Sequence, residues 1–405
     1  MEHTYQLYSS LPKREGGGTV AEIDLSALQH NYRVLRKEVE KKDGGDGSPR
    51  IIAVVKADAY GHGAPACVEA LLEAGCDFFA VSCVDEARAV RAVCREKSQP
   101  ADVLVLGYTA PKNAGILAEE DLIQALHSPH HADLLCREAE AAGVTVRAHV
   151  AVDTGMHRVG FAAWRESMLK GTAEDIQRVC ARDALSVEGA FTHFACADDP
   201  DDCRTEHQSR LFRELTRLLR QQGVKIPFLH ACNSAAAILR DEDRLDGIRP
   251  GILLYGVSPS AALSLPLRPV MRLKTEITHL HPLFAGERLG YGGDFQADTD
   301  RRVATLPIGY ADGVLRGYRG GRVTVVTAKG VYRCPIVGRV CMDQCMIDVT
   351  DTTAAEGDTV ILFGDDPHSL SALAARAGTV EYESLCAVSA RVPRVYIHSQ
   401  KESLS

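Results

Sequence analysis

The sequence predicts an α/β protein in which an N-terminal (β/α)8 TIM-like barrel is followed by a mostly β C-terminal domain. Eight apolar runs recur between residues 51 and 256, with helical segments between them. Continuous apolar runs are typical of parallel strands buried on both faces, and eight units favour a closed barrel over an open sheet. After residue 265 the segments alternate or are β-rich, and glycine turns divide them, which is typical of antiparallel strands.

The predicted barrel strands are the apolar runs themselves. They are IIAVVK (51–56), CDFFAVS (76–82), DVLVLG (102–107), LIQALH (122–127), VTVRAHVAV (144–152), SVEGAFTHF (186–194), IPFLHACN (226–233) and IRPGILLYG (248–256). A ninth run, VAEIDL (20–25), precedes the first predicted helix. No GxGxxG motif follows an early strand, which argues against a dinucleotide-binding sheet.

The segments between these runs have the features of helices. The segment 64–75 carries Pro65 near its first turn and ends at Gly75, and these residue types favour a helix start and a helix end respectively. Four leucines lie on one side of the segment 203–223, at Leu211, Leu215, Leu218 and Leu219. The regular alternation indicates successive β-α units.

The C-terminal third is predicted to be a separate domain. Its strand-like segments are VMRLKTEITHLHPL (270–283), RRVATLPIG (301–309), GRVTVVTAKGVYRCPIVGRV (321–340), QCMIDVT (344–350) and DTVILFG (358–364). Only SLSALAARAG (369–378) has a good helical pattern. The segment 258–269, with its serine, proline and alanine, is the predicted linker. We therefore expect domains at residues 16–262 and 270–400.

Composition and charge exclude several classes of protein. The 405 residues carry a formal net charge of −8, which argues against sequence-independent nucleic-acid binding because that needs a basic face. No apolar run approaches the roughly 20 residues that cross a bilayer. The first 20 residues lack the apolar core of a signal peptide, and the final KESLS carries no address that we recognise. A cytoplasmic location is expected.

Neither the cysteines nor the histidines predict a metal site. The 13 cysteines are scattered without CxxC spacing, which fits a reducing compartment and no disulfide framework. Cys341 and Cys345 lie in a strand-like run and are expected to be structural. HSPHH (127–131) is expected to form a solvated turn, and the acidic segment 196–203 lacks calcium-loop spacing.

Lys56 is the first candidate for chemistry. It stands at the C-terminal end of an apolar strand, where (β/α)8 enzymes form their active sites. Partial desolvation there would lower the pKa of the amine and supply the neutral form that Schiff-base chemistry needs. Taken alone, however, a lysine at a strand end more often points to water.

The motif around Lys56 is one of nine that occur in a fixed order. They are AVVKADAYGHG (53–63), VDTGMHRVGF (152–161), THFACAD (192–198), HACNSAA (230–236), RPGILLYG (249–256), LGYGGDF (289–295), LPIGYADG (306–313), PIVGRVCMDQ (335–344) and VEYE (380–383). Together they closely resemble the alanine racemase family, from roughly Val20 to Tyr396. That family has an N-terminal (β/α)8 barrel and a C-terminal β domain, which agrees with the pattern above.

The resemblance implies a homodimer that interconverts L- and D-alanine with pyridoxal 5'-phosphate (PLP), as in D-alanine biosynthesis. A conjugated iminium spreads the charge left when the Cα proton departs, and inversion needs a proton donor-acceptor on each face. By resemblance, Lys56 holds PLP as a Schiff base and acts on one face. Tyr291 acts on the other face, from the partner subunit.

The other site residues are also implied by motif matches. Arg249 would face the pyridine nitrogen and, being always protonated, could not accept the ring proton as a carboxylate would. His193 would lie behind Tyr291 or near the ring, and Asn233 would lie in the cofactor site or cap a helix. The candidates for holding the phosphate are Tyr60, Ser234, Gly251, Ile252 and Tyr382. Those for the substrate carboxylate are Arg158 and Met342. Those lining the entrance are Tyr310, Arg316, Arg339 and Asp343.

One position departs from the family pattern. Many members have a lysine, often carbamylated, two residues before the aspartate of the DTGM motif, and here that position is Ala151. The lost group carries negative charge that helps to hold the arginine matching Arg158. A buried guanidinium without a partner is costly, so we expect a replacement anion near Arg158. Chloride and a nearby carboxylate, with Asp153 the nearest in sequence, are both open.

Three other functions stay open. A racemase for serine or for several small amino acids would differ from an alanine racemase only in the groups that distinguish one small side chain from another. Such discrimination is worth about 1–3 kcal/mol. A non-catalytic PLP carrier with a single barrel would need neither the C-terminal domain nor Tyr291. A basic amino-acid decarboxylase shares the two-domain plan but normally carries a cysteine-centred motif late in the β domain, which we do not find.

Overall fold

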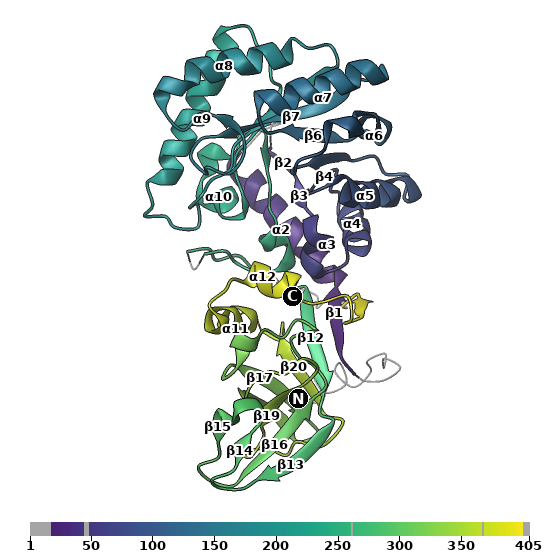
Figure 1. Cartoon of the computed structure of the whole chain (residues 1–405), viewed down its shortest axis with the longest axis vertical. Coiled ribbons are helices and arrows are strands. Elements are labelled where there is room, and N and C mark those ends of the chain that lie inside the picture. Colours follow the sequence, from purple (N-terminus) through teal and green to yellow (C-terminus); the bar gives the residue numbers. More distant parts are fainter. Residues whose placement is uncertain (1–17, 44–47, 261, 367, 400–405) are drawn as a thin grey trace.

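The barrel is built from parallel strands that follow the predicted apolar runs. The computed structural model describes residues 18–43, 48–260, 262–366 and 368–399, so the expectations about the chain ends lie mostly outside the described residues. In the upper part of Figure 1 the strands pair in the order β2-β11-β10-β9-β7-β6-β5-β4-β3. Since β2 and β3 are two pieces of one segment, residues 50–54, the order closes on itself as eight strands.

Strands and helices alternate along this part of the chain. The strands are β2 (Arg50–Ile51), β3 (Ala53–Val54), β4 (Phe78–Val81), β5 (Asp102–Val105), β6 (Ile123–Leu126), β7 (Val146–Asp153), β9 (Leu185–Phe191), β10 (Phe228–His230) and β11 (Gly247–Ile248), with β8 (Phe161–Ala162) beside β7. The helices are α2 (Leu25–Asp43), α3 (Lys56–Gly61), α4 (Ala64–Glu73), α5 (Val84–Glu96), α6 (Ala114–Glu119), α7 (Pro129–Ala142), α8 (Glu166–Cys180), α9 (Arg204–Gln221) and α10 (Ser234–Leu239). Short 3-10 helices are η1 (Pro111–Asn113), η2 (Asp241–Asp243) and η3 (Ile252–Tyr255). None of the described helices is both long and apolar enough to cross a membrane.

The HSPHH segment begins a helix, so the expectation of a solvated turn is wrong. Ser128 caps α7 by accepting a hydrogen bond from the backbone N of His131 at 3.1 Å, and Pro129 occupies the first turn. Serine followed by proline is a helix-start signal that the expectation overlooked. His131 is buried against the carbonyl of Thr109 rather than solvated.

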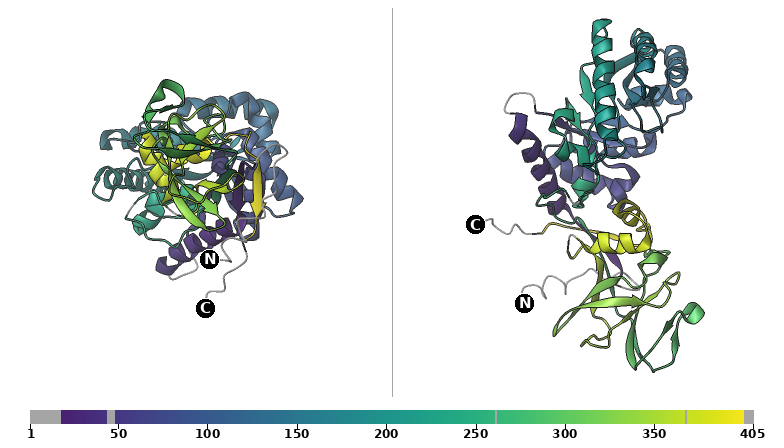
Figure 2. Two further views of the ribbon diagram at one scale, coloured as in Figure 1. Left: turned by 90° about the horizontal axis from the view of Figure 1, so that it is seen from below. Right: turned by 90° about the vertical axis from the view of Figure 1, so that its left-hand side faces the viewer.

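The C-terminal part is one nine-stranded sheet with two short helices. Its strands pair in the order β13-β16-β19-β18-β17-β20-β12-β1-β21, while β14 and β15 form a separate hairpin. Their bounds are β1 (Val20–Asp24), β12 (Met271–Glu276), β13 (His279–Leu283), β14 (Arg288–Leu289), β15 (Phe295–Gln296), β16 (Arg301–Leu306), β17 (Arg322–Thr327), β18 (Gly330–Val337), β19 (Cys345–Asp348), β20 (Thr359–Phe363) and β21 (Arg394–Ile397). The 3-10 helices are η4 (Tyr291–Gly293) and η5 (Arg316–Tyr318). Helices α11 (Ser369–Ala377) and α12 (Glu381–Cys386) lie on the side of this sheet that faces the barrel (Figures 1 and 2).

The first strand belongs to the C-terminal sheet and not to the barrel. β1 pairs antiparallel with β12 and parallel with β21. Within the sheet, the buried Lys274 donates to Glu22 at 2.5 Å, although 252 positions separate the two residues. From β1 in the C-terminal sheet, the described chain therefore enters the barrel through α2.

The last barrel strand is shorter than its apolar run. β11 contains only Gly247 and Ile248, and the run then passes into η3. Pro250 has no N–H to donate, although its carbonyl still accepts from the backbone N of Val54 at 3.0 Å. The chain consequently turns at the mouth of the barrel.

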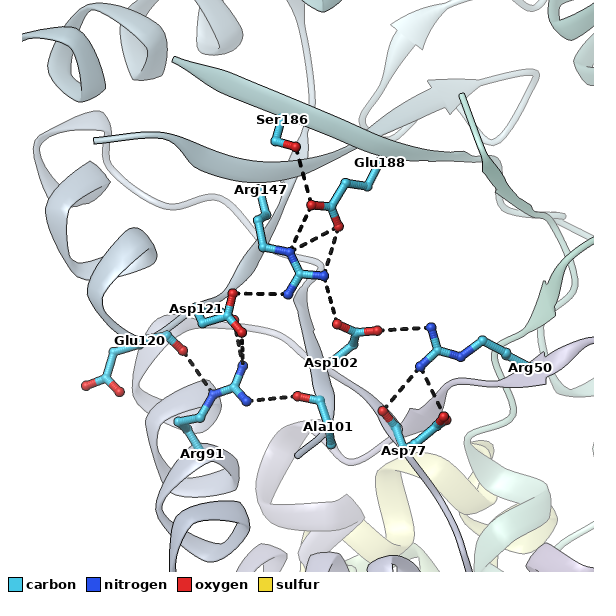
Figure 3. Close-up of polar contacts among 10 residues, drawn as sticks. All are labelled: Arg50, Asp77, Arg91, Ala101, Asp102, Glu120, Asp121, Arg147, Ser186 and Glu188. Atoms are coloured by element: carbon cyan, nitrogen blue, oxygen red, sulfur yellow. Dashed lines mark hydrogen bonds and ion pairs between the residues drawn. The ribbon is translucent and has the colours of Figure 1, made fainter. Parts of the chain in front are cut away.

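Charged side chains close the opposite end of the barrel (Figure 3). Arg147 bonds to Asp102 and Glu188 at 2.8 Å each and to Asp121 at 3.1 Å. Arg50 reaches the other oxygen of Asp102 at 2.9 Å. Most of these groups lie at the N-terminal ends of the strands, the end that stabilises a barrel rather than carrying its active site.

Candidate active site

A cavity of about 740 Å³ opens at the C-terminal ends of the barrel strands. The predicted site residues that line it are Lys56, Tyr60, Arg158, His193, Asn233, Ser234, Arg249, Gly251 and Tyr382. Tyr382 belongs to α12, so the C-terminal part closes one side of a site that the barrel loops otherwise build. Another cavity, of about 850 Å³ between α8 and α9, contains none of the predicted residues, and it is lined by paired charges such as Arg210 with Glu166. The barrel cavity is therefore the candidate active site.

Lys56 begins α3, with one residue between it and the end of β3, at the mouth of the barrel. Burial lowers the pKa of its ammonium, the nearby Arg158 lowers the pKa further, and Glu86 and Cys386 oppose the shift. A lower pKa increases the fraction of neutral amine, which is the form that attacks a carbonyl carbon. Lys56 therefore has the environment that Schiff-base chemistry requires.

The turn after Lys56 has an unusual backbone. Ala57, Asp58, Ala59 and Tyr60 all have left-handed angles, with φ between 52° and 54°. None of them is glycine, and left-handed helical geometry costs roughly 1–2 kcal/mol per residue. Such strain persists only where the surroundings fix it, and it is concentrated at functional sites.

Arg249 is buried at one side of the cavity without a carboxylate partner among the described residues. Its Nη1 donates to Nδ1 of His230 at 2.6 Å, and its Nη2 donates to the carbonyls of Thr192 at 2.6 Å and Ala231 at 2.9 Å. Burial lowers the pKa of Arg249 to about 10, so the guanidinium is still charged at neutral pH. Arg249 can therefore donate to a ring nitrogen but cannot take a proton from one.

Hydroxyl and amide groups gather around Gly251. Its amide donates to Oγ of Ser234 at 2.9 Å, and a Cβ at this glycine would lie only 2.4 Å from the hydroxyl of Tyr60. Asn233 caps α10 by accepting a backbone hydrogen bond at 3.1 Å. Burial raises the pKa of Tyr60 and raises that of Tyr382 to about 12, so both hydroxyls stay protonated and can donate. Neutral donors beside a glycine that only hydrogen fits make a cradle of the kind that accepts a phosphate group.

Seven predicted site residues do not line this cavity. They are Ile252, Tyr291, Tyr310, Arg316, Arg339, Met342 and Asp343. Ile252 is fully buried at the start of η3, directly behind the Gly251 turn. The other six belong to the C-terminal part, where Tyr291 is 71% exposed and Met342 is 54% exposed. Within one chain, Tyr291 therefore does not line the cavity that contains Lys56.

Arg339 lies against the turn that carries Tyr291. Its guanidinium bonds to both oxygens of Asp294, at 2.7 and 3.0 Å, and a Cβ at Gly292 would lie 2.8 Å from its Cζ. Asp343 is instead paired with Arg391 at 2.9 Å. Arg339 therefore holds the Tyr291 turn in addition to any part in an entrance.

Asp153 does not replace the missing carbamate. Its carboxylate accepts from the backbone N of Gly155, His157 and Arg158 at 2.9–3.1 Å, so it organises the loop rather than the Arg158 guanidinium. The assumption of a buried Arg158 is also wrong for the single chain, in which this residue is exposed. The strand β7 ends at Asp153, so Arg158 lies in the loop that follows rather than side by side with Asp153 on a regular strand. A chloride near Arg158 stays a prediction.

Two features of the site were not predicted from the sequence. Glu86, in the first turn of α5, accepts from the backbone N of Ala57, next to Lys56. His149 lies inside the barrel, and its Nδ1 is 3.0 Å from Nε2 of His230. For His149, the available signal was a histidine inside an apolar strand run. The Glu86 contact left no signal in the sequence, because it is made to backbone.

Comparison with known proteins agrees with this geometry. The profile of the alanine racemase N-terminal domain matches residues 23–259, and that of the alanine racemase C-terminal domain matches residues 270–396. The chain belongs to the alanine racemase family. An alanine racemase of Methanococcus maripaludis is 38% identical over 385 residues, which are 93% of this chain and 98% of that protein. One of Desulfovibrio desulfuricans is 37% identical over 380 residues, covering 93% of this chain and 97% of that protein.

Solved structures of the family have the same two-part fold. Alanine racemase of Clostridium difficile 630 superposes with a TM-score of 0.83 at 33% identity, covering 94% of this chain and 96% of that one. Alanine racemase of Bacillus anthracis, solved with bound L-Ala-P, gives a TM-score of 0.82 at 32% identity and 97% coverage of both chains. The predicted barrel and β domain are thereby confirmed as the architecture of the chain.

Proposed function

We propose that this protein racemises alanine with PLP bound in the barrel cavity. The observation that carries the proposal is the meeting of three groups in one cavity: the amine of Lys56 with its lowered pKa, the buried Arg249, and the cradle at Gly251. When bound, PLP supplies a conjugated ring that withdraws electrons from the Cα–H bond of an amino acid. Membership of the alanine racemase family supports alanine as the substrate.

The residues that would hold PLP follow from the donors present. Tyr60, Ser234, Tyr382 and the Gly251–Ile252 turn would hold its phosphate, with Asn233 fixing the start of α10. Lys56 would bond covalently to its aldehyde carbon. Arg249 would donate to the ring nitrogen and leave it without a proton, because His230 and two carbonyls already fix the guanidinium as a donor. His193, which lines the same cavity, would lie beside the ring.

Two bases on opposite faces would move the proton. Lys56 serves one face, and we infer that Tyr291 serves the other from a second copy of the chain. The exposure of Tyr291, and its position on the C-terminal part away from its own cavity, support a homodimer with shared sites. The first predicted domain, residues 16–262, would then bind the cofactor through its barrel, although β1 within these bounds lies in the C-terminal sheet, and residues 270–400 would complete the partner's site.

The remaining roles concern the substrate. Arg158 and the backbone at Met342 would bind its carboxylate, while Tyr310, Arg316, Arg339 and Asp343 would line the entrance. A cytoplasmic location and a role in D-alanine biosynthesis follow from the same proposal. No nucleic acid or membrane is involved in it.

A chiral assay tests the proposal. Purified protein with added PLP is incubated with L-alanine, and D-alanine is measured by chiral chromatography. The expected result is convergence on equal amounts of both enantiomers, starting from either one. Parallel incubations with L-serine detect a serine racemase, and measurement of released CO2 detects a decarboxylase. If no amino acid is converted, the function as a non-catalytic PLP carrier is the one that remains.

A further inference from the structure

The first peptide of the left-handed turn has a single side-chain anchor. The Ala57 nitrogen donates to Oε1 of Glu86 at 2.7 Å. Among the described residues, no other side chain hydrogen-bonds this amide. The amide belongs to the peptide that joins Lys56 to Ala57, so holding it restrains the ψ angle of Lys56 and anchors the Cα from which the lysine side chain leaves the backbone.

The same carboxylate joins two neighbouring strand ends. Its other oxygen, Oε2, accepts from the backbone N of Ser82 at 2.7 Å, and Ser82 directly follows β4. β4 is the parallel neighbour of β3, which leads into Lys56. Glu86 therefore bridges the C-terminal ends of two barrel strands with two short hydrogen bonds to an ionised group, which are stronger than bonds between neutral groups.

The far end of the turn is anchored separately. Asp58 Oδ1 accepts from the backbone N of Ala64 at 2.7 Å, and the Gly63 amide donates to the Asp58 carbonyl at 3.0 Å. These bonds hold the exit of the turn toward α4, while Glu86 holds its entry at Lys56. Four consecutive left-handed residues that are not glycine need such external restraint.

We propose that Glu86 is a positioning residue for Lys56, whose carboxylate locks the left-handed turn to the end of β4 and so aims the lysine at the cofactor. The inference rests on the proposed function for the identity of that cofactor. The negative charge of Glu86 has a second consequence. It opposes the lowering of the Lys56 pKa by burial and by Arg158. Glu86 then both orients the amine and tunes its protonation.

Glu86→Gln is the sharpest test, because glutamine has the same shape but only one carbonyl oxygen to accept two N–H groups, and no charge. Asp85→Asn is the matched control. It removes the same charge from the same first turn of α5, and no hydrogen bond or ion pair of Asp85 is found in the described chain. Circular dichroism and thermal melting establish that both variants are folded.

The first readout needs no cofactor. Hydrogen exchange followed by mass spectrometry, on the full chain without PLP, should show at least tenfold faster exchange at the Ala57 and Ser82 amides in Glu86→Gln. Asp85→Asn should exchange like the wild type. Unchanged exchange at both amides in Glu86→Gln would overturn the proposal whether or not the protein binds PLP.

The second readout uses the PLP-loaded protein. Glu86→Gln should weaken PLP binding about tenfold or more and lower kcat with a smaller change in KM. It should also move the pH at which the cofactor absorption band changes to a lower value, because a negative charge that favours protonation is lost. If the wild type binds PLP and racemises alanine while Glu86→Gln matches it in affinity, kcat and spectrum, the positioning role is refuted and the proposed function stands. A wild type that neither binds PLP nor racemises alanine would refute the proposed function. The hydrogen-exchange result would still show whether Glu86 holds the turn after Lys56 to the end of β4.

Discussion

Nη1 of Arg249 donates to Nδ1 of His230 at 2.6 Å, and His230 continues through its Nε2 to Nδ1 of His149 at 3.0 Å. Both imidazoles are buried, and burial lowers the pKa of each, with that of His149 falling to about 3. They are therefore neutral, and the arginine at one end sets which nitrogen of each ring carries the proton. Gly189 makes room for these hydrogen-bonded side chains, since a Cβ there would lie 2.6 Å from the His149 ring.

Removing the acceptor for Arg249 should destabilise the protein. His230→Leu leaves a buried charged donor with one partner fewer, and such a loss costs roughly 1–3 kcal/mol. The free energy of unfolding, measured by urea titration, should fall by about that amount, and PLP binding should weaken. His130→Leu, an exposed histidine on α7, is the control and should change neither quantity. Equal stability of His230→Leu and the wild type would contradict this view of Arg249.

The buried histidines predict a loss of stability in acid. Burial holds His62 and His149 neutral by lowering their pKa values to about 4 and about 3, whereas an unfolded histidine titrates near 6.5. Below that pH the unfolded chain binds protons that the folded chain refuses. The free energy of unfolding should thus fall as the pH drops from about 6.5, by up to about 1.4 kcal/mol per pH unit for each histidine. Urea titrations between pH 7 and pH 4.5 measure the slope, and His149→Gln should reduce it by about one proton. An identical slope in that variant would mean that His149 is not held neutral.

The barrel was predictable from sequence because its signal is local. Continuous apolar runs mark strands buried on both faces, and the strand that leads into Lys56 lies where the run IIAVVK placed it. The short helix α12 and the start of α7 at Pro129 were missed, although the second had a usable cap in Ser128.

Long-range pairings were not predictable in the same way. Nothing in the run 20–25 indicates that it lies between β12 and β21, because that choice depends on partners hundreds of residues away. The left-handed turn after Lys56 contains no glycine before Gly61 to announce it, and the Glu86 contact is made to backbone. The role proposed for Tyr291 was recognised only through its motif, since a residue proposed to act in a second copy of the chain is not expected to reveal its partners within its own chain.

Tyr291→Phe tests the assignment of one base to each face. Racemisation should fall by roughly 10²–10⁴-fold, the usual contribution of a general acid-base group. Exchange of the Cα proton in deuterium oxide, followed by NMR, should survive for one enantiomer of alanine only. Tyr332→Phe, on β18, is the control and should keep both activities. Equal residual exchange from both enantiomers would point to a single base.

Subunit mixing tests the shared site. Lys56→Ala and Tyr291→Phe proteins are each expected to be inactive, and exchange of their subunits should create one intact site in every heterodimer. In an equal mixture, half of the dimers are heterodimers, so activity should recover to about one quarter of the wild-type value for a two-fold symmetric assembly. Each variant incubated alone is the control. Proven subunit exchange without recovery would show that both residues act within one chain.

The central claim is that Lys56 carries the cofactor, and borohydride reduction tests it most directly. The PLP-loaded protein is reduced, digested and analysed by peptide mass spectrometry. We expect a phosphopyridoxyl label on Lys56, within the peptide that contains AVVKADAYGHG, and none in Lys56→Ala. A label on a different lysine, or a full label in Lys56→Ala, would contradict the account.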